Sequence, residues 1–255
     1  MVKERIDTIL VNKGYVSSRE KARALVIAGA VYLGEERITK PDRRINVDAL
    51  IEVRKRGLPY VSFGGAKLEE ALKQFHIPVS GKKAMDIGSS TGGFTDCLLQ
   101  FGASRVYAID VGTHQLHESL REDPRVILKE NFNARYLTYD DIGERVDIIT
   151  IDVSFISLKK ILPPAASLLH SKGYIISLFK PQFELGRSDV GRGGIVKNIE
   201  KIEKAIDEMK HFGMAIGLNP VSVIESPREK ERKNREFFIL WELQRDQNPS
   251  NSSQV

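Results

Sequence analysis

Residues 86–96, DIGSSTGGFTD, determine how the larger part of this chain folds. The apolar run KAMDIG leads into this glycine-rich turn, and the helix-like pattern CLLQF follows it. In a strand–loop–helix unit of this kind, glycines let the backbone come close to a bound nucleotide-like ligand. The stretch therefore predicts a ligand site at the end of a strand.

Three classes of ligand compete for this loop. A nucleoside triphosphate loop needs Gly-Lys-Ser/Thr after its last glycine, whereas Phe94 and Thr95 follow here. A dinucleotide fingerprint has the form G-x-G-x-x-G, whereas this loop is G-S-S-T-G-G. The third ligand is S-adenosylmethionine, whose ribose is typically held by an acidic residue after the second strand, where Asp110 lies. Because an acidic residue there also suits NAD, the loop and Asp110 alone leave the choice open.

Strand and helix patterns alternate from Lys83 onward, which predicts an α/β domain with a mostly parallel, doubly wound sheet. A helix over 66–77 leads into it. The connection before the last strand is too short for a helical crossover, so that strand is expected to be antiparallel. The strand-like runs are 83–88, 105–110, 125–128, 146–152, 173–179, 220–226 and 236–243.

The first part of the chain predicts a separate small α+β domain over residues 1–53. An amphipathic helix ends at Gly14, and Ser17 or Ser18 caps a second helix that ends near Gly29. Short strand-like pieces follow. Residues 54–65 are typical of a linker, 66–243 form the α/β domain, and the polar residues 244–255 predict a disordered tail.

All of the excess positive charge lies in the first quarter of the chain. Residues 1–60 contain 13 Lys and Arg against 8 Asp and Glu, and the remaining residues contain 26 of each. A basic unit joined to a neutral body is typical of proteins that bind phosphate backbones. A solvated surface with a chance asymmetry is the other interpretation.

Other features exclude several classes of protein. Cys97 is the only cysteine, so no intramolecular disulfide forms, which suits a reducing cytoplasm. The five histidines have no carboxylate or thiol partners at ligand spacing, so no metal site is expected. The N-terminal residues lack the apolar core of a secretory signal, and no apolar run is long enough to span a membrane.

The N-terminal domain resembles the S-four RNA-binding domain, first known from a small-subunit ribosomal protein. The resemblance is carried by Arg5, Asp7 and Leu10, then Gly14, the run SREKA from Ser18, and Ile27, Gly29 and Val31. It implies an RNA-facing side formed by Arg5, Ser18, Arg19, Lys21 and Arg23. The linker residues Arg54, Lys55 and Arg56 are expected to extend this side.

The whole chain is similar to the TlyA family, apart from its last dozen residues. After the opening stretch, the family's motifs YVSFGGAKLEEAL, IDVSFISL, LFKPQFE and NREFF occur in order. The resemblance implies an S-four domain followed by an FtsJ-like, Rossmann-like methyltransferase domain that uses S-adenosylmethionine. Members of the family methylate ribose 2′-hydroxyls of ribosomal RNA, and some carry the name hemolysin.

The same resemblance assigns residues to the site. The catalytic set is Lys67, Asp152, Lys180 and Glu236, with Lys180 as the general base. A partly buried lysine can act as a base near neutral pH. Asp152 and Lys67 would orient it and tune its charge, and Glu236 would hold Lys67 or the ribose. The cofactor set is Asp86, Gly88, Ser90, Gly92, Gly93, Phe94, Asp110, Val111, Asn131 and Asp152. The loop with Gly88, Ser90 and Gly92 is expected to leave room for the methionine end of the cofactor.

The leading prediction is therefore a cytoplasmic rRNA 2′-O-methyltransferase that acts on ribosomal subunits. A non-catalytic RNA-binding or assembly factor and a membrane-active hemolysin are the alternatives. The complete Lys-Asp-Lys-Glu set disfavours the first. The absence of a spanning helix and of an export signal disfavours the second. A pseudouridine synthase would need its own Arg-Leu-Asp motif, which is not found.

Overall fold

The structure, a computed structural model, describes residues 3–27, 29–34, 36–53, 59–228 and 234–244. The chain divides into two units, Met1–Pro59 and Tyr60–Val255. Residues 60–65, which were predicted to belong to the linker, are part of the second unit. Tyr60 is buried there, and helix α3 (Phe63–Gln74) begins three residues before the predicted start at residue 66.

The N-terminal unit packs two helices against short strands. The helices are α1 (Ile6–Asn12) and α2 (Arg19–Ile27). The strands pair as β3-β2-β5 and as β1-β4, and their bounds are β1 (Lys3–Arg5), β2 (Val31–Leu33), β3 (Glu36–Ile38), β4 (Arg44–Asn46) and β5 (Ile51–Val53). The core includes Ile6, Ile9, Leu10, Ala22 and Val26, which are fully or almost fully buried. The predicted α+β organisation is confirmed, and β1 and β4 are additional strands.

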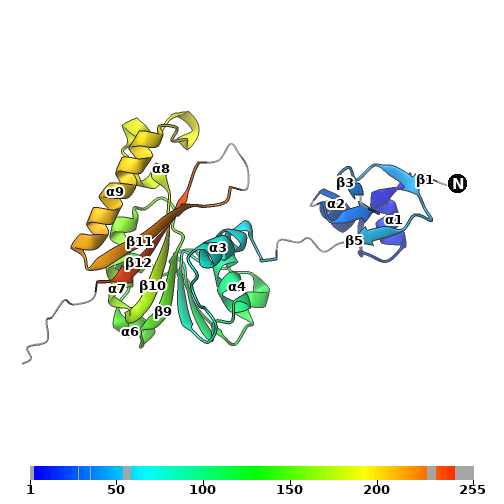
Figure 1. The fold of residues 1–255 in the computed structure, drawn as a ribbon. Coiled ribbons are helices and arrows are strands. Elements are labelled where there is room, and N and C mark those ends of the chain that lie inside the picture. Colours follow the sequence, from blue (N-terminus) through cyan, green and yellow to red (C-terminus); the bar gives the residue numbers. More distant parts are fainter. Residues whose placement is uncertain (1–2, 28, 35, 54–58, 229–233, 245–255) are drawn as a thin grey trace, which may run out of the picture. The chain divides into compact units, whose positions relative to one another are not determined.

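The second unit is built on a seven-stranded sheet with the order β11-β12-β10-β9-β6-β7-β8 (Figure 1). Its strands are β6 (Lys83–Ile87), β7 (Arg105–Ile109), β8 (Val126–Lys129), β9 (Val146–Ile151), β10 (Leu169–Phe179), β11 (Leu218–Glu225) and β12 (Phe237–Leu243). The pairs from β8 to β10 are parallel, and β12 is antiparallel to both β10 and β11. The predicted sheet with an antiparallel last strand is confirmed.

Helices cover both faces of this sheet (Figure 1). α3 and α4 (Gly93–Gln100) pack on one face, and α7 (Leu162–Ser167) and α9 (Ile199–Ala215) pack on the other, each with its own apolar core. On α9 the buried residues recur every three or four positions, as in an amphipathic helix. The short helices are α5 (Glu118–Arg121), α6 (Tyr139–Ile142) and α8 (Pro181–Glu184), and 3-10 turns lie at Ala134–Tyr136, Leu158–Lys160, Arg187–Asp189 and Arg192–Gly194.

The strand register fixes which residues meet at the carboxyl edge of the sheet. Ile87, at the end of β6, pairs with Ile109 of β7 and with Ile151 of β9. Phe179, at the end of β10, pairs with Phe237, the first residue of the antiparallel β12. The residues just after β6, β7, β9 and β10, and the residue just before β12, therefore share one edge. In open α/β sheets this edge is where ligands bind.

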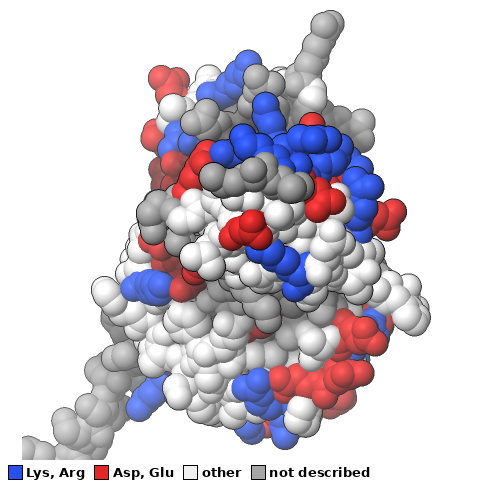
Figure 2. All heavy atoms as spheres, turned by 90° about the vertical axis from the view of Figure 1, so that its right-hand side faces the viewer, with Lys and Arg blue, Asp and Glu red and all other residues white. Residues whose placement is uncertain are grey.

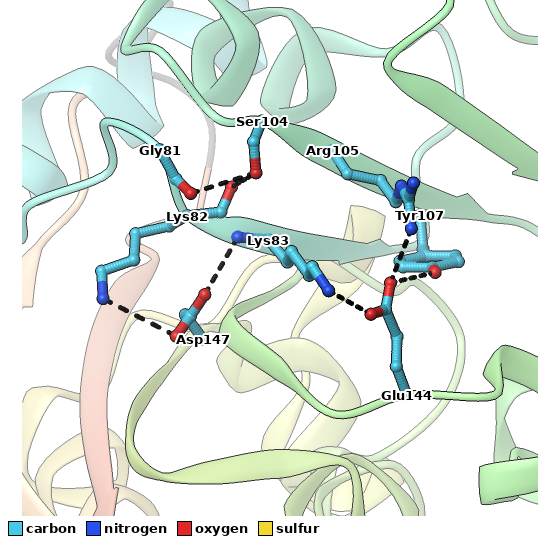
Figure 3. Close-up of polar contacts among 8 residues, drawn as sticks. All are labelled: Gly81, Lys82, Lys83, Ser104, Arg105, Tyr107, Glu144 and Asp147. Carbon is cyan, nitrogen blue, oxygen red and sulfur yellow. Dashed lines mark hydrogen bonds and ion pairs between the residues drawn. The ribbon is translucent and has the colours of Figure 1, made fainter.

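At the opposite, amino edge of the sheet, where the parallel strands begin, charged side chains form ion pairs and hydrogen bonds (Figure 3). The carboxylate of Glu144 accepts hydrogen bonds from Arg105 Nη1 at 2.9 Å and Tyr107 Oη at 2.6 Å, and it also pairs with Lys83 Nζ. Asp147 accepts the backbone N–H of Lys83 at 3.0 Å. The bonds to Lys83, Tyr107 and Arg105 lower the pKa of Glu144 to about 2. These contacts link the starts of β6, β7 and β9.

Candidate active site

The glycine loop between β6 and α4 makes close contacts with the rest of the domain. Gly88 has a φ of +85°, and a Cβ at this position would lie 2.4 Å from the carbonyl oxygen of Asp152. Gly92 has a φ of +98°, and its Cβ would lie 2.3 Å from a methyl carbon of Leu120. Both the backbone conformation and the lack of space exclude larger residues here. At Gly92 the space is filled by leucine side chains, so this glycine serves packing.

Asp110 lies directly after β7 and faces the glycine loop. Its Oδ2 accepts the backbone N–H of Ser90 at 2.8 Å, and its Oδ1 accepts that of Gly112 at 2.7 Å. These two bonds fix the carboxylate, and each oxygen keeps a further lone pair. Such a carboxylate can accept hydrogen bonds from a pair of vicinal hydroxyls.

Two cavities open beside the glycine loop at the carboxyl edge. The first, of about 440 Å³, is lined by five of the predicted cofactor residues, namely Gly88, Ser90, Asp110, Val111 and Asp152. Ile87 and Ile109 contribute apolar surface to it. The second, of about 410 Å³, contains Gly93 and Phe94 together with Lys67, Asp152 and Lys180. Gly88, Ser90, Asp152 and Ser154 line both cavities, so the two are adjacent.

Three predicted cofactor residues line neither cavity: Asp86, Gly92 and Asn131. Asp86 is fully buried in β6, where it accepts hydrogen bonds from Thr95 Oγ1 at 2.7 Å and Thr150 Oγ1 at 3.1 Å. Burial raises the pKa of Asp86 to about 7. The structure therefore places this carboxyl group beneath the loop. Asn131 is exposed and has a φ of +53° in the turn after β8.

Lys180 and Asp152 meet where β10 and β9 end. Lys180 Nζ lies 2.5 Å from Asp152 Oδ1 and donates a hydrogen bond to Ser154 Oγ at 3.1 Å. Asp152 Oδ1 is buried, so this ion pair is shielded from solvent at the carboxylate oxygen. Lys180 is 9% exposed and Asp152 is half-buried. A largely buried ammonium group that contacts one carboxylate and one hydroxyl beside a cavity is a candidate functional group.

The other two predicted catalytic residues also form a pair. Lys67 Nζ on α3 lies 2.6 Å from Oε2 of Glu236, the residue just before β12. Both side chains are largely shielded from solvent, at 17% and 19% exposure. Since Lys67 and Lys180 line the same cavity, the structure brings all four predicted residues to one side of the carboxyl edge as two ion pairs.

Phe155 is a feature that sequence reasoning missed. It is 91% exposed and has a φ of +62°, a conformation that costs a non-glycine residue free energy. It lines the first cavity, and its ring centroid lies 5.1 Å from that of Phe183. Strained backbone and exposed aromatic rings both occur preferentially at binding sites. The sequence places Phe155 within IDVSFISL, but it carries no signal for the left-handed backbone.

The predicted RNA-facing residues of the N-terminal unit lie around the start of α2. Arg19, Lys21 and Arg23 are exposed on α2, and Ser18 Oγ accepts the backbone N–H of Lys21 at 3.3 Å. Arg5 and Arg19 both contact Asp7. In the face shown in Figure 2, Lys and Arg side chains gather in one region. The predicted contacts Arg54, Lys55 and Arg56 lie outside the described residues.

Comparison with known proteins assigns the second unit. A family model described as FtsJ-like methyltransferase matches residues 60–243. The chain belongs to the FtsJ-like methyltransferase family. An S4 domain model matches residues 4–51, which is the domain predicted above from the S-four resemblance.

Relatives match the whole chain and not only its parts. The chain is 40% identical over 243 residues to a Mycobacterium tuberculosis protein named 16S/23S rRNA (cytidine-2′-O)-methyltransferase TlyA, covering 95% of this chain and 91% of the relative. A solved Streptococcus thermophilus structure, described as a candidate hemolysin, is 40% identical with a TM-score of 0.73, covering 96% and 90% of the two chains. The predicted resemblance to the TlyA family is confirmed.

A more distant structure supports the fold alone. A Listeria monocytogenes protein described as a candidate S-adenosylmethionine-dependent methyltransferase is 18% identical with a TM-score of 0.55, over 71% of this chain and 99% of that chain. This likeness confirms the predicted fold class, and the family match over residues 60–243 confirms the prediction of a methyltransferase. Within the described residues, no group of His, Cys, Asp and Glu is arranged to hold a metal ion, and no helix could span a membrane.

Proposed function

We propose that this FtsJ-like methyltransferase transfers a methyl group from S-adenosylmethionine to a ribose 2′-hydroxyl of ribosomal RNA. The observation that carries the proposal is the pair of ion pairs, Lys180–Asp152 and Lys67–Glu236, beside the cavity that contains Asp110. The TlyA relative, named for ribose methylation of rRNA, supports the same reaction.

The residues of the first cavity suit S-adenosylmethionine. Asp110 would accept hydrogen bonds from its ribose hydroxyls, and Ile87 and Ile109 would contact its adenine. Gly88 lets the loop pass within contact of Asp152, and Ser90 lies where the two cavities meet. Ser89 lines the second cavity, and its Oγ is buried with no hydrogen-bond partner among the described residues, so it would bond the amino-acid end of the cofactor. A buried hydroxyl of this kind is costly unless a ligand satisfies it.

Lys180 is the general base in this proposal. When bound, the cofactor supplies an electrophilic methyl group on a sulfonium centre. The ribose hydroxyl must lose its proton as its oxygen attacks, and Lys180 Nζ accepts this proton when the amine is neutral. Asp152 and Ser154 hold Nζ at the end of β10. Lys67, which lines the same cavity and pairs with Glu236, would help to orient the ribose, so that positioning supplies much of the rate.

The N-terminal unit supports RNA as the binding partner. Its S4 domain match and its exposed basic residues support binding to the phosphate backbone, so affinity is expected to fall steeply with salt. Ribosomal RNA or ribosomal subunits are the proposed substrate. A cytoplasmic location agrees with such a substrate.

Two alternative functions can be distinguished from the proposed enzyme. A non-catalytic RNA-binding or assembly factor has no use for two shielded ion pairs beside a ligand cavity, and this observation favours the enzyme. A membrane-active hemolysin would release dye from liposomes, and such release by the purified protein would support that function.

Methyl transfer by wild-type protein and by Lys180→Ala tests the proposal. The purified protein is incubated with methyl-labelled S-adenosylmethionine and with small or large ribosomal subunits from cells that lack the gene. We expect label at a ribose 2′-oxygen with the wild type and a loss of at least about a hundredfold with Lys180→Ala, since general-base catalysis contributes about 10²–10⁴-fold.

Cofactor affinity provides the control for this experiment. Lys180→Ala is expected to bind S-adenosylmethionine with nearly wild-type affinity in calorimetry, because the residues proposed to hold its nucleoside, Asp110, Ile87 and Ile109, line the first cavity and Lys180 does not. Undiminished turnover by the variant would exclude Lys180 as the base. The absence of label in both subunits with wild-type protein would contradict the proposed function itself.

A further inference from the structure

Asp7 is a buried carboxylate shared by two arginines of the N-terminal unit. Its side chain is 0% exposed. Arg5 donates to it from Nε at 3.1 Å and from Nη2 at 3.0 Å, and Arg19 donates from Nη2 at 3.2 Å. Both Nη2 groups contact the same oxygen, Oδ2, so the two guanidinium groups are held side by side.

The three residues come from different elements. Arg5 is the last residue of β1, Asp7 lies in the first turn of α1, and Arg19 is the first residue of α2. The hydrogen bonds lower the pKa of Asp7 to about 2, and the bond from Arg5 makes the largest contribution. Asp7 is therefore ionised under all ordinary conditions, and the group of three carries one net positive charge.

Stability alone does not account for this arrangement. Burying a carboxylate costs free energy, and a buried ion pair is often no more stabilising than apolar residues of the same volume. What the shared carboxylate does supply is geometry. Two like charges would otherwise repel each other, and two long side chains would otherwise lose conformational entropy on binding a ligand.

We propose that Asp7 is a positioning residue that holds Arg5 and Arg19 together as a site for one phosphate group of the RNA. The proposal rests on the proposed function only in taking the anion to be an RNA phosphate.

The N–H groups of Arg5 and Arg19 that do not contact Asp7 suit a phosphate ligand. Among the contacts of the described residues, Arg5 uses only Nε and Nη2 on Asp7, and Arg19 uses only Nη2. The other N–H groups of both remain available, and the two side chains are 39% and 57% exposed. Arginine N–H groups in a fixed plane match the oxygens of a phosphate, and pre-ordering them reduces the entropy lost on binding.

Asp7→Asn tests whether Asp7 acts by positioning the arginines or by its charge, because the two roles predict opposite changes in RNA affinity. The substitution removes one negative charge from a basic unit, so net charge alone predicts tighter RNA binding. If Asp7 positions the arginines, the KM for ribosomal subunits instead rises about tenfold, while kcat stays within about twofold. Asp7→Glu, which keeps the carboxylate, is expected to recover part of the loss.

Glu36→Gln is the matched control. Glu36 also pairs with an arginine through two hydrogen bonds, from Arg43 at 2.7 and 2.9 Å, but it is exposed, and Arg43 is the one arginine that contacts it among the interactions of the described residues. This variant is expected to keep its KM within about twofold. An equal rise in KM for both variants would overturn the proposal, as would tighter binding by Asp7→Asn.

Variants of the two arginines test directly whether both side chains bind the same phosphate. They do so even if Asp7→Asn folds poorly. Arg5→Ala, Arg19→Ala and the double variant are compared by the slope of log affinity for the subunits against log salt concentration. A shared phosphate predicts that the slope falls by about one in each variant, including the double, and that the losses of affinity are not additive. A fall of about two in the double variant, with additive losses, would show separate phosphates. If these variants behave as proposed but the wild type transfers no methyl group, only the proposed function fails.

Discussion

Asp86 carries the buried carboxyl group beneath the glycine loop. Its neighbours in the sequence led us to predict a contact with the cofactor; in β6 its carboxyl group is fully buried and bonded to two threonines, and Asp86 lines neither cavity. In a strand, successive side chains alternate between faces, and the sequence alone does not fix which face Asp86 occupies. Thr95 of α4 and Thr150 of β9 supply its hydrogen bonds, so Asp86 ties the loop-bearing strand to its neighbours.

The raised pKa of Asp86 makes a prediction about stability against pH. Its pKa is about 7 in the folded protein, against 3.8 for an ordinary aspartate, because burial disfavours the charged form. The folded state therefore binds a proton that the unfolded state has released, and this group makes the protein less stable as pH rises from about 4 to 7. Asparagine does not titrate, so Asp86→Asn lacks this pH-dependent part of the stability. Urea unfolding is expected to show that the free energy of unfolding falls less between pH 5 and pH 8 in the variant than in the wild type. Equal losses in both proteins would contradict this role.

At the scale of elements, two adjacent glycines explain where α3 begins. Phe63, Gly64 and Gly65 were predicted to be linker because glycine pairs usually interrupt helices, yet they form the first turn of α3. A Cβ on Gly65 would lie 2.2 Å from Tyr60 Cγ, whereas one on Gly64 would meet nothing nearer than Ser62 Oγ at 3.3 Å. Gly65 therefore allows the close packing that holds α3, and with it Lys67, against the domain.

Alanine at the two positions is expected to have opposite effects. Gly65→Ala should lower the free energy of unfolding by about 1–3 kcal/mol, because the methyl group has no room beside Tyr60. It should also lower methyl transfer, since Lys67 lies two residues further along the helix. Gly64→Ala should be neutral or stabilising by up to about 1 kcal/mol, because alanine favours the helix. Urea titrations of the two variants measure the difference, and equal effects would refute the packing argument.

The same element scale shows what sequence patterns can predict. The β/α alternation predicted the parallel part of the sheet, and the short connection before the last strand predicted that this strand is antiparallel. The strands β1 and β4 were not predicted; they pair with each other across about 40 residues of chain, which no local pattern shows. For the site, the residues that follow strands were placed correctly at one edge. The pairing of Lys67 with Glu236, Phe155's left-handed backbone and Asp7's shared carboxylate depend on tertiary contacts.

At the scale of the molecule, the two units have separate cores and can be followed separately. Trp241 is the only tryptophan, and it is fully buried in β12, where its Nε1 donates to Ser177 Oγ at 2.8 Å. Its fluorescence therefore reports on the second unit alone. Far-ultraviolet circular dichroism reports on both units. Two probes of one unfolding experiment can thus separate the acid sensitivity of the two units.

Acid unfolding of the second unit is expected to depend on Glu144 at the amino edge (Figure 3). Its pKa is about 2 in the folded protein, against 4.5 for an ordinary glutamate, chiefly because of the hydrogen bond with Lys83. The stability that this group contributes is therefore fully present above about pH 4.5 and is lost as the pH falls toward 2. Glu144→Gln should have a lower free energy of unfolding than the wild type at pH 7 and a similar one near pH 2, when urea unfolding is followed by Trp241 fluorescence.

Glu208→Gln, at an exposed position on α9, is the control and should have the free energy of unfolding of the wild type at every pH. A constant gap between Glu144→Gln and the wild type from pH 7 to pH 2 would show that the charge of Glu144 does not stabilise this edge.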